Sequence, residues 1–135
     1  MLVKGMIKDG ELIKFEECDF DLENLTLQAN LEKDIHIILS NLGLRQSNKG
    51  YVYLKDAIKK ATEDYEYIDL ITKAMYPYLA KKHHTTASRV ESAIRHLIHT
   101  MPETEFRSKV FQYDMDRFSN KEFIVLIVNY IQYCH

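Results

Sequence analysis

Seven polar side chains recur at helical spacing between residues 87 and 99, and their types suit hydrogen bonding to nucleic acid. At 100° per residue they fall on one side of a helix: Ser88, Arg89, Glu91, Ser92, Arg95, His96 and His99. Arginine can donate two hydrogen bonds to guanine O6 and N7, glutamate can accept from cytosine N4, and serine can serve several partners. The opposite side is apolar: Ala87, Val90, Ala93, Ile94, Leu97 and Ile98. Because any amphipathic helix exposes charges, this pattern alone leaves a solvated surface and a DNA-reading surface both open.

To reach the major groove of a duplex, such a helix must be held by a second helix that crosses it closely. A helix-turn-helix has a short first helix, a tight turn and a small residue at the crossing. The segment Tyr76–Lys82 suits the first helix because proline is favoured in a first turn, and Ala80 is the small residue. We expect residues 83–85 to form the turn, with Thr85 or Thr86 as N-cap of the second helix. His84 stands near the place where many such turns have glycine, so we expect it in the left-handed backbone region.

The distribution of charge also separates this segment from the rest of the chain. The formal net charge is -2, which by itself argues against a nucleic-acid partner. Residues 76–99, however, contain four Lys or Arg (Lys81, Lys82, Arg89 and Arg95) against Glu91 alone, a net charge of +3. The other parts of the chain, residues 1–50, 51–75 and 100–135, each have a negative net charge. Attraction to DNA depends on the local field, so we predict that Lys81 and Lys82 hold backbone phosphates at the start of the motif.

Apolar periodicity elsewhere predicts an all-α fold of about six helices that includes the helix-turn-helix. Stripes at helical spacing run through residues 27–42, 54–61 and 68–75, and Gly43 is expected to end the first of these helices. The third is expected to break before Pro77, because a residue before proline avoids the helical region. Residues 103–111 are predicted to be helical, and a capping box from Ser119 to Glu122 opens a final helix over residues 120–133.

The N-terminal residues have a different pattern. Short apolar-polar runs flank Lys8-Asp9-Gly10, and Asp-Gly in this setting predicts a β-hairpin. The acidic stretch over residues 16–23 resembles a linker. We therefore divide the chain into a hairpin with an acidic linker, residues 1–25, and a helical domain, residues 26–135.

Other classes of function have little support in the sequence. His96 and His99, with His83 and His84 nearby, lack the cysteine or carboxylate partners of an ordinary zinc site, so no metal or cofactor is expected. Three acidic residues near the C-terminus accompany no nucleophile or glycine loop, so no enzyme is expected: Asp114, Asp116 and Glu122. Six tyrosines at helical spacing are predicted to lie at the core edge rather than to stack on bases: Tyr51, Tyr53, Tyr65, Tyr67, Tyr76 and Tyr78. With two distant cysteines, no signal peptide and no apolar run of membrane-spanning length, we expect a soluble cytoplasmic protein that makes no contact with membranes.

Several stretches together resemble the effector domain of the stage-zero sporulation response regulator A, the master regulator of endospore formation. They are KGYVYLKDAI (49–58), ITKAMYP (71–77), LAKK (79–82), TTASRVE (85–91) and AIRH (93–96), with weaker similarity at Phe111, Tyr113 and NKEFI (120–124). The resemblance covers residues 30–133, and residues 85–96 are its most specific part. It implies an all-helical, sequence-specific DNA-binding transcriptional regulator that reads the major groove with helix 87–99 and binds double-stranded promoter boxes, often in tandem.

The resemblance also assigns residues and partners. Ser88, Arg89, Glu91 and Arg95 stand where the family places DNA contacts, and the full predicted set adds Lys81, Lys82, Thr86, Ser92 and His96. A homodimer on tandem sites, RNA polymerase and a related regulator are the partners that it suggests.

The sequence departs from the family pattern in three places. About 30 residues precede the effector region, too few for the receiver domain that family members carry, so we expect a stand-alone domain. Ser92 replaces an arginine that the family uses on DNA, and the connection between His96 and Asn120 is short. These departures leave a second hypothesis open: a protein-binding module that has lost strong DNA reading and modulates a related regulator or the transcription machinery, with the hairpin pairing onto a partner's sheet edge.

Overall fold

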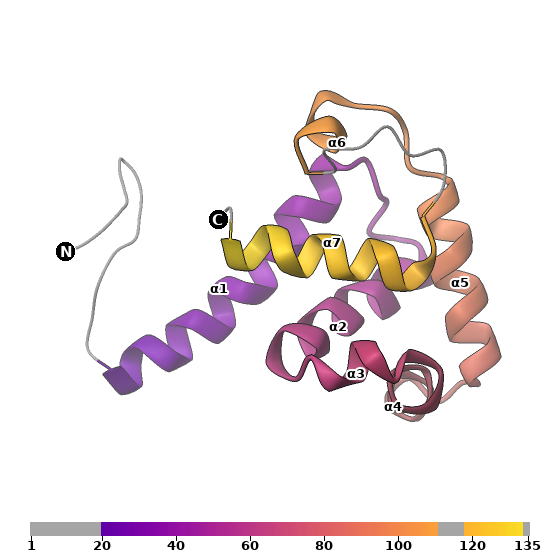
Figure 1. Ribbon diagram of the computed structural model, residues 1–135, viewed down its shortest axis with the longest axis horizontal. Coiled ribbons are helices and arrows are strands. Elements are labelled where there is room, and N and C mark those ends of the chain that lie inside the picture. The colour runs from indigo at the N-terminus through magenta and orange to yellow at the C-terminus, as the bar shows by residue number, and fades with distance from the viewer. Residues whose placement is uncertain (1–19, 111–117, 134–135) are drawn as a thin grey trace. The chain divides into compact units, whose positions relative to one another are not determined.

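The computed structural model describes residues 20–110 and 118–133, and within these ranges every regular element is a helix (Figure 1). In chain order the helices are α1 (Phe20–Asn41), α2 (Lys49–Glu63), α3 (Glu66–Asp69), the π-helix η1 (Ile71–Met75), α4 (Tyr76–Lys82), α5 (Ala87–His99), α6 (Glu105–Val110) and α7 (Asn120–Tyr133). The all-α prediction is confirmed for this part of the chain. The predicted N-terminal hairpin, like Asp114 and Asp116, lies outside the described residues.

The chain divides into residues 1–31 and a helical body, residues 32–135, and the body contains the helix-turn-helix segment. Helix α1 begins at Phe20, earlier than the periodicity indicated and inside the stretch expected to be a linker. The separation of residues 1–25 as a domain of their own stays a prediction.

Gly43 ends α1 as the sequence indicated. Its φ of +85° is left-handed, and the two hydrogen bonds of a Schellman motif close the helix, from Gly43 N to Ser40 O at 2.9 Å and from Leu44 N to Leu39 O at 3.1 Å. Leu39 and Leu44 are both buried beside this turn. The chain then reaches α2, where the Asn48 side chain caps the helix by accepting from Gly50 N at 2.8 Å.

The core of the body forms where α2 packs against both α5 and α7, and α5 also packs against α4 and α7 (Figure 1). The apolar stripes predicted for α1, α2 and α5 supply fully buried side chains, among them Ile35, Leu54, Ile58 and Ile94, and α7 adds Phe123 and Ile127. Of the six tyrosines expected at the core edge, Tyr51, Tyr53 and Tyr76 are buried, whereas Tyr65 is exposed. The apolar side of α7 is thus used by the core of the body itself.

The predicted third helix, residues 68–75, is interrupted. Leu70 leaves the helical region with φ -110° and ψ 47°, which separates α3 from the π-helix η1. The predicted break before Pro77 takes an unexpected form, because Tyr76 is itself helical with φ -63° and ψ -44°. The Tyr76 backbone N–H donates to Ile71 O, five residues back, so a wide turn precedes Pro77, whose ring would clash with a carbonyl in a regular helix interior.

Helix α7 opens at the predicted capping box. Ser119 N donates to Glu122 Oε1 at 2.9 Å, and Glu122 N donates to Ser119 Oγ at 3.1 Å. Hydrogen bonding of the Glu122 carboxylate to Ser119, through the Ser119 backbone N–H first and its side chain second, holds the pKa of Glu122 below its usual value. The structure therefore fixes where α7 starts, and its first residue, Asn120, is buried. None of the helices in the described ranges has the length and apolarity needed to cross a membrane.

Candidate nucleic-acid interface

Helices α4 and α5 with the residues between them form the predicted helix-turn-helix. Two backbone hydrogen bonds close the turn, from His83 N to Leu79 O at 3.0 Å and from Thr85 N to Ala80 O at 2.9 Å. Ala80 is buried, as a small residue at a helix crossing must be. Thr86 is the N-cap of α5, and its side-chain oxygen accepts from Arg89 N at 3.2 Å. Between the two N-cap candidates, the structure selects Thr86.

His84 has a φ of +56°, so the predicted left-handed residue in the turn is confirmed. Among the described residues other than glycine it is the one with a positive φ. Its side chain is exposed, and this backbone conformation costs about 1–2 kcal/mol for a residue with a Cβ.

Replacing His84 by glycine should raise the free energy of unfolding by up to about 1 kcal/mol, because the removed strain exceeds the extra chain entropy of glycine. Replacing it by valine should lower that free energy by about 1 kcal/mol, since a β-branched residue tolerates positive φ poorly. Urea unfolding followed by circular dichroism measures both. A glycine variant no more stable than the valine variant would show that the turn does not need this backbone conformation.

The inner side of α5 packs as its periodicity predicted. Val90, Ile94, Leu97 and Ile98 are buried. The approach of α2 is close enough that a Cβ built on Gly50 would lie 2.4 Å from the Ala93 carbonyl oxygen. A glycine early in α2 thus sets how near the two helices come, and the sequence patterns gave no sign of this role.

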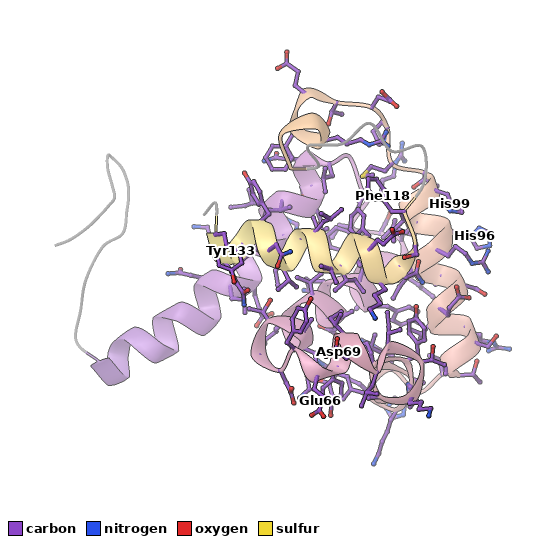
Figure 2. All side chains as sticks on the ribbon, viewed as in Figure 1. Glu66, Asp69, His96, His99, Phe118 and Tyr133 are labelled. Atoms are coloured by element: carbon purple, nitrogen blue, oxygen red, sulfur yellow. The ribbon has the colours of Figure 1, made fainter. Side chains whose placement is uncertain are left out.

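The outer side of α5 carries the predicted polar residues with different degrees of exposure. Ser88, Arg89, Arg95, His96 and His99 are exposed, and Glu91 and Ser92 are half-buried. Figure 2 shows His96 and His99 projecting away from the body. Within the described part of the chain, the Arg89 guanidinium makes no hydrogen bond or ion pair, so it is free to bind an external acceptor.

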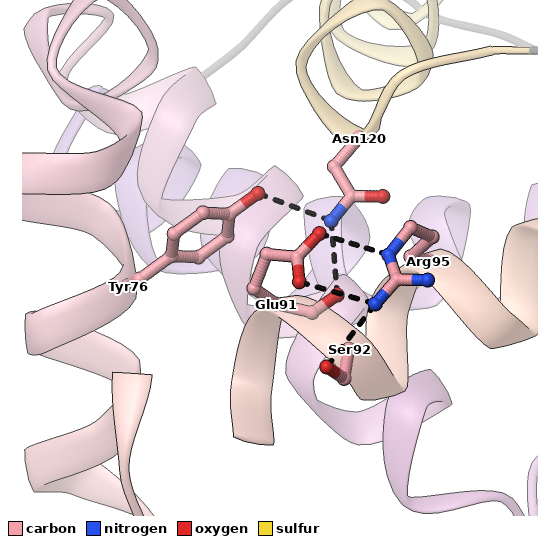
Figure 3. A network of polar contacts seen from close by, with 5 residues as sticks. All are labelled: Tyr76, Glu91, Ser92, Arg95 and Asn120. Carbon is pink, nitrogen blue, oxygen red and sulfur yellow. Dashed lines mark hydrogen bonds and ion pairs between the residues drawn. The ribbon is translucent and has the colours of Figure 1, made fainter. Parts of the chain in front are cut away.

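Arg95, by contrast, is held within its own helix. Its Nε donates to Glu91 Oε2 at 3.1 Å, and its Nη2 donates to Glu91 Oε1 at 3.5 Å and to Ser92 Oγ at 3.3 Å (Figure 3). Ser92 thus helps to orient the neighbouring arginine. The Glu91 carboxylate offsets the charge of Arg95, which leaves Arg89 as the stronger electrostatic feature of this surface.

The backbone behind this ion pair is tied to two other helices. The Asn120 side-chain amide donates to the Glu91 carbonyl oxygen at 3.1 Å and to the Tyr76 hydroxyl at 3.0 Å (Figure 3). Burial raises the pKa of Tyr76, and the hydrogen bond from Asn120 works in the opposite direction. The first residues of α4 and α7 are thus both joined to the middle of α5 through one amide.

The two lysines at the end of α4 differ in their surroundings. Lys81 is exposed and makes no side-chain ion pair in the described residues. Lys82 Nζ lies 3.3 Å from Asp56 Oδ2, and the same oxygen lies 2.7 Å from His83 Nε2. The ring of His83 also packs edge-on against Tyr53, with centroids 5.1 Å apart. Asp56 on α2 therefore anchors the turn and offsets part of the positive charge that Lys82 would present to a phosphate.

Replacing Asp56 by asparagine should have two opposite effects. The unfolding free energy should fall by about 1 kcal/mol, because a partly buried charge-assisted contact to His83 is lost. Affinity for generic duplex DNA should rise, and its salt dependence should steepen by about 0.9, because Lys82 becomes free for one more phosphate. Fluorescence anisotropy at several salt concentrations measures the second effect. The control is Asp69→Asn, the same charge change at an exposed residue of α3; equal DNA affinities for the two variants would contradict the masking of Lys82.

The histidines of this region do not gather around a common point. Among the described residues, no group of three or more His, Cys, Asp or Glu side chains could hold a metal ion. The structure instead assigns His83 to the Asp56 contact and leaves His84, His96 and His99 exposed. The candidate site therefore consists of the outer side of α5 and the contacts that support it.

One comparison with known proteins bears on this arrangement. The model of the family described as "Sporulation initiation factor Spo0A C terminal" matches residues 35–131, more than half of the chain. The matched range contains all of α4, the turn and α5, the supporting helix α2, and Asn120 at the start of α7.

Proposed function

The chain belongs to the Spo0A C-terminal family, the DNA-binding effector domain of a sporulation initiation factor, and we propose that it acts as a sequence-specific transcriptional regulator whose α5 enters the major groove. The observation that carries this proposal is the geometry of the motif: a capped α5 is held across α4 by a closed turn, with a free arginine at the N-terminal end of its outer surface. In helix-turn-helix proteins the N-terminal residues of the second helix contact base edges.

The outer residues divide by role. Arg89 is suited to bind guanine bidentately, while Ser88, Glu91, Ser92 and Arg95 supply further contacts to bases or phosphates. Lys81, Lys82, Thr86 and His96 surround this surface and are suited to backbone phosphates, which position the domain without reading sequence. Of the two lysines, Lys81 is the stronger candidate because Lys82 is paired with Asp56.

The proposal also includes the kind of DNA that the domain binds and its further partners. We infer binding to promoter boxes in the cytoplasm, with a homodimer on tandem boxes and with RNA polymerase or a related regulator as further partners. Support for this comes from the family, and the net charge of -2 favours attraction through the local surface of α4 and α5 rather than through the whole molecule.

Selection of bound sequences from a random pool of duplex DNA tests the proposal. We expect an enriched sequence that contains guanine at the Arg89 position. A salt titration of the winner should give a slope of log affinity against log salt of about -0.9 for each phosphate contact. No enriched sequence after several rounds would contradict the proposal.

Two ion pairs favour a second candidate function, the binding of another protein. Glu91 offsets Arg95 and Asp56 offsets Lys82, which reduces the charge that a DNA-binding surface needs. In the alternative, the domain keeps the fold and binds a related regulator or a transcription protein. The same selection separates the two, since the alternative predicts weak binding without any preferred sequence.

A further inference from the structure

Asn120 is a polar residue in an apolar place. Among the side chains that the structure describes, it is the one amide or charged group that is buried, with 7% of its surface exposed. It is the first residue of α7, next to the capping box, and its neighbours on the same helix, Phe123 and Ile124, are fully buried. The capping box accounts for Ser119 and Glu122 but not for an amide inside the core.

Both hydrogens of this amide are used. One is donated to the Tyr76 hydroxyl and the other to the Glu91 carbonyl oxygen (Figure 3). Apolar side chains of similar shape in place of such a buried polar pair are often neutral or stabilising. Stability alone therefore gives no reason for an amide here, whereas two directional bonds to two different helices fix an orientation that apolar packing leaves adjustable.

The orientation that is fixed belongs to the outer surface of α5. Glu91 accepts from Asn120 through its backbone and from Arg95 through its carboxylate. A rotation of α5 about its axis would break the bond to Asn120 and would turn Arg95 by the same angle. Such small rotations matter because base readout depends on the direction of each hydrogen bond, while phosphate attraction does not.

We propose that Asn120 is a positioning residue for DNA reading, which sets the rotation of α5 against α4 and α7 and so aims the Arg95 guanidinium. This inference rests on the proposed function. It predicts that loss of the amide lowers affinity for the selected sequence more than affinity for generic duplex DNA.

The test compares Asn120→Asp with Asn129→Asp in the full chain. Both variants make the same change on α7, but Asn129 is exposed. Only the change at residue 120 removes the two donors and sets a carboxylate against the Glu91 carbonyl oxygen. Anisotropy titrations give the dissociation constants for the selected duplex and for a scrambled duplex of the same length. The ratio of the scrambled-duplex constant to the selected-duplex constant should fall about tenfold in Asn120→Asp and stay unchanged in Asn129→Asp.

Tyr76→Phe keeps the aromatic packing and removes one acceptor of the Asn120 amide. This variant tests the positioning role of Asn120 if Asn120→Asp does not fold. The ratio should fall about threefold in this variant, with the thermal unfolding midpoint above the temperature of the assay. The NMR signal of Arg95 Nε–H should shift in both variants, which a merely structural role would not require.

An unchanged ratio in folded Tyr76→Phe and Asn120→Asp would overturn the inference and leave the proposed function standing. Failure of the proposed function has a different signature: the unaltered protein would itself bind the selected and scrambled duplexes equally well.

Discussion

Arg89→Ala should lose most of the preference for the selected DNA sequence. A bidentate contact from arginine to guanine contributes about 1–3 kcal/mol of discrimination, so affinity for that sequence should fall roughly 5- to 150-fold. We expect Arg89 to dominate because its guanidinium has no partner in the described residues, whereas Arg95 is held by Glu91 and Ser92. Anisotropy titration of the selected duplex, with the same duplex mutated at the guanine as a second substrate, measures both affinity and preference.

The matched control for this prediction is Arg45→Ala. Arg45 is exposed in the loop between α1 and α2, so its replacement removes the same charge at a place outside the motif. Its loss should lower affinity for both duplexes slightly and equally, as a change in the long-range field does. Equal losses in the Arg89 and Arg45 variants would mean that residue 89 contributes charge alone and reads no base.

The elements that carry the site could be predicted from the sequence because their signals are local. An amphipathic period fixed α5 as Ala87–His99, and a capping box fixed α7 as Asn120–Tyr133. The left-handed backbone at His84 followed from its place in the turn. Each of these features depends on residues within a few positions of one another, so one stretch of sequence contains all the information needed.

The supports of the site could not be predicted because they join residues far apart in the chain. Asp56 meets His83 across 27 positions, and Asn120 meets Tyr76 across 44. In the sequence, Asp56 is an ordinary charge on a helix and Asn120 is one letter of a capping box. The break at Leu70 and the π-helix after it are similar, since the apolar period continues unchanged through them and the packing of the body decides the backbone.

The contacts on the inner side of α5 link DNA binding to folding. The same contacts that stabilise the folded domain also place the outer side of α5 for DNA. The position of the outer surface of α5 depends on the inner contacts that hold the helix, and one of these is the close approach of α2 at Gly50. A Cβ at Gly50 would lie 2.4 Å from the Ala93 carbonyl oxygen and 3.0 Å from the Ala93 carbonyl carbon. The atoms in the way belong to the backbone of α5, so no side-chain rotation relieves the clash.

Gly50→Ala should therefore lower the unfolding free energy by about 1–3 kcal/mol, as overpacking of a tight core does, although alanine is the better helix former by about 1 kcal/mol. Because α5 must move outward from α2, affinity for the selected DNA should fall even at temperatures where the variant is fully folded. Urea unfolding and anisotropy titration measure the two effects. Lys49→Ala is the control, since it makes a helix-favouring change at the exposed neighbouring residue. If Gly50→Ala were as stable as Lys49→Ala and bound DNA as tightly, close contact between α2 and α5 would not be what places the recognition surface.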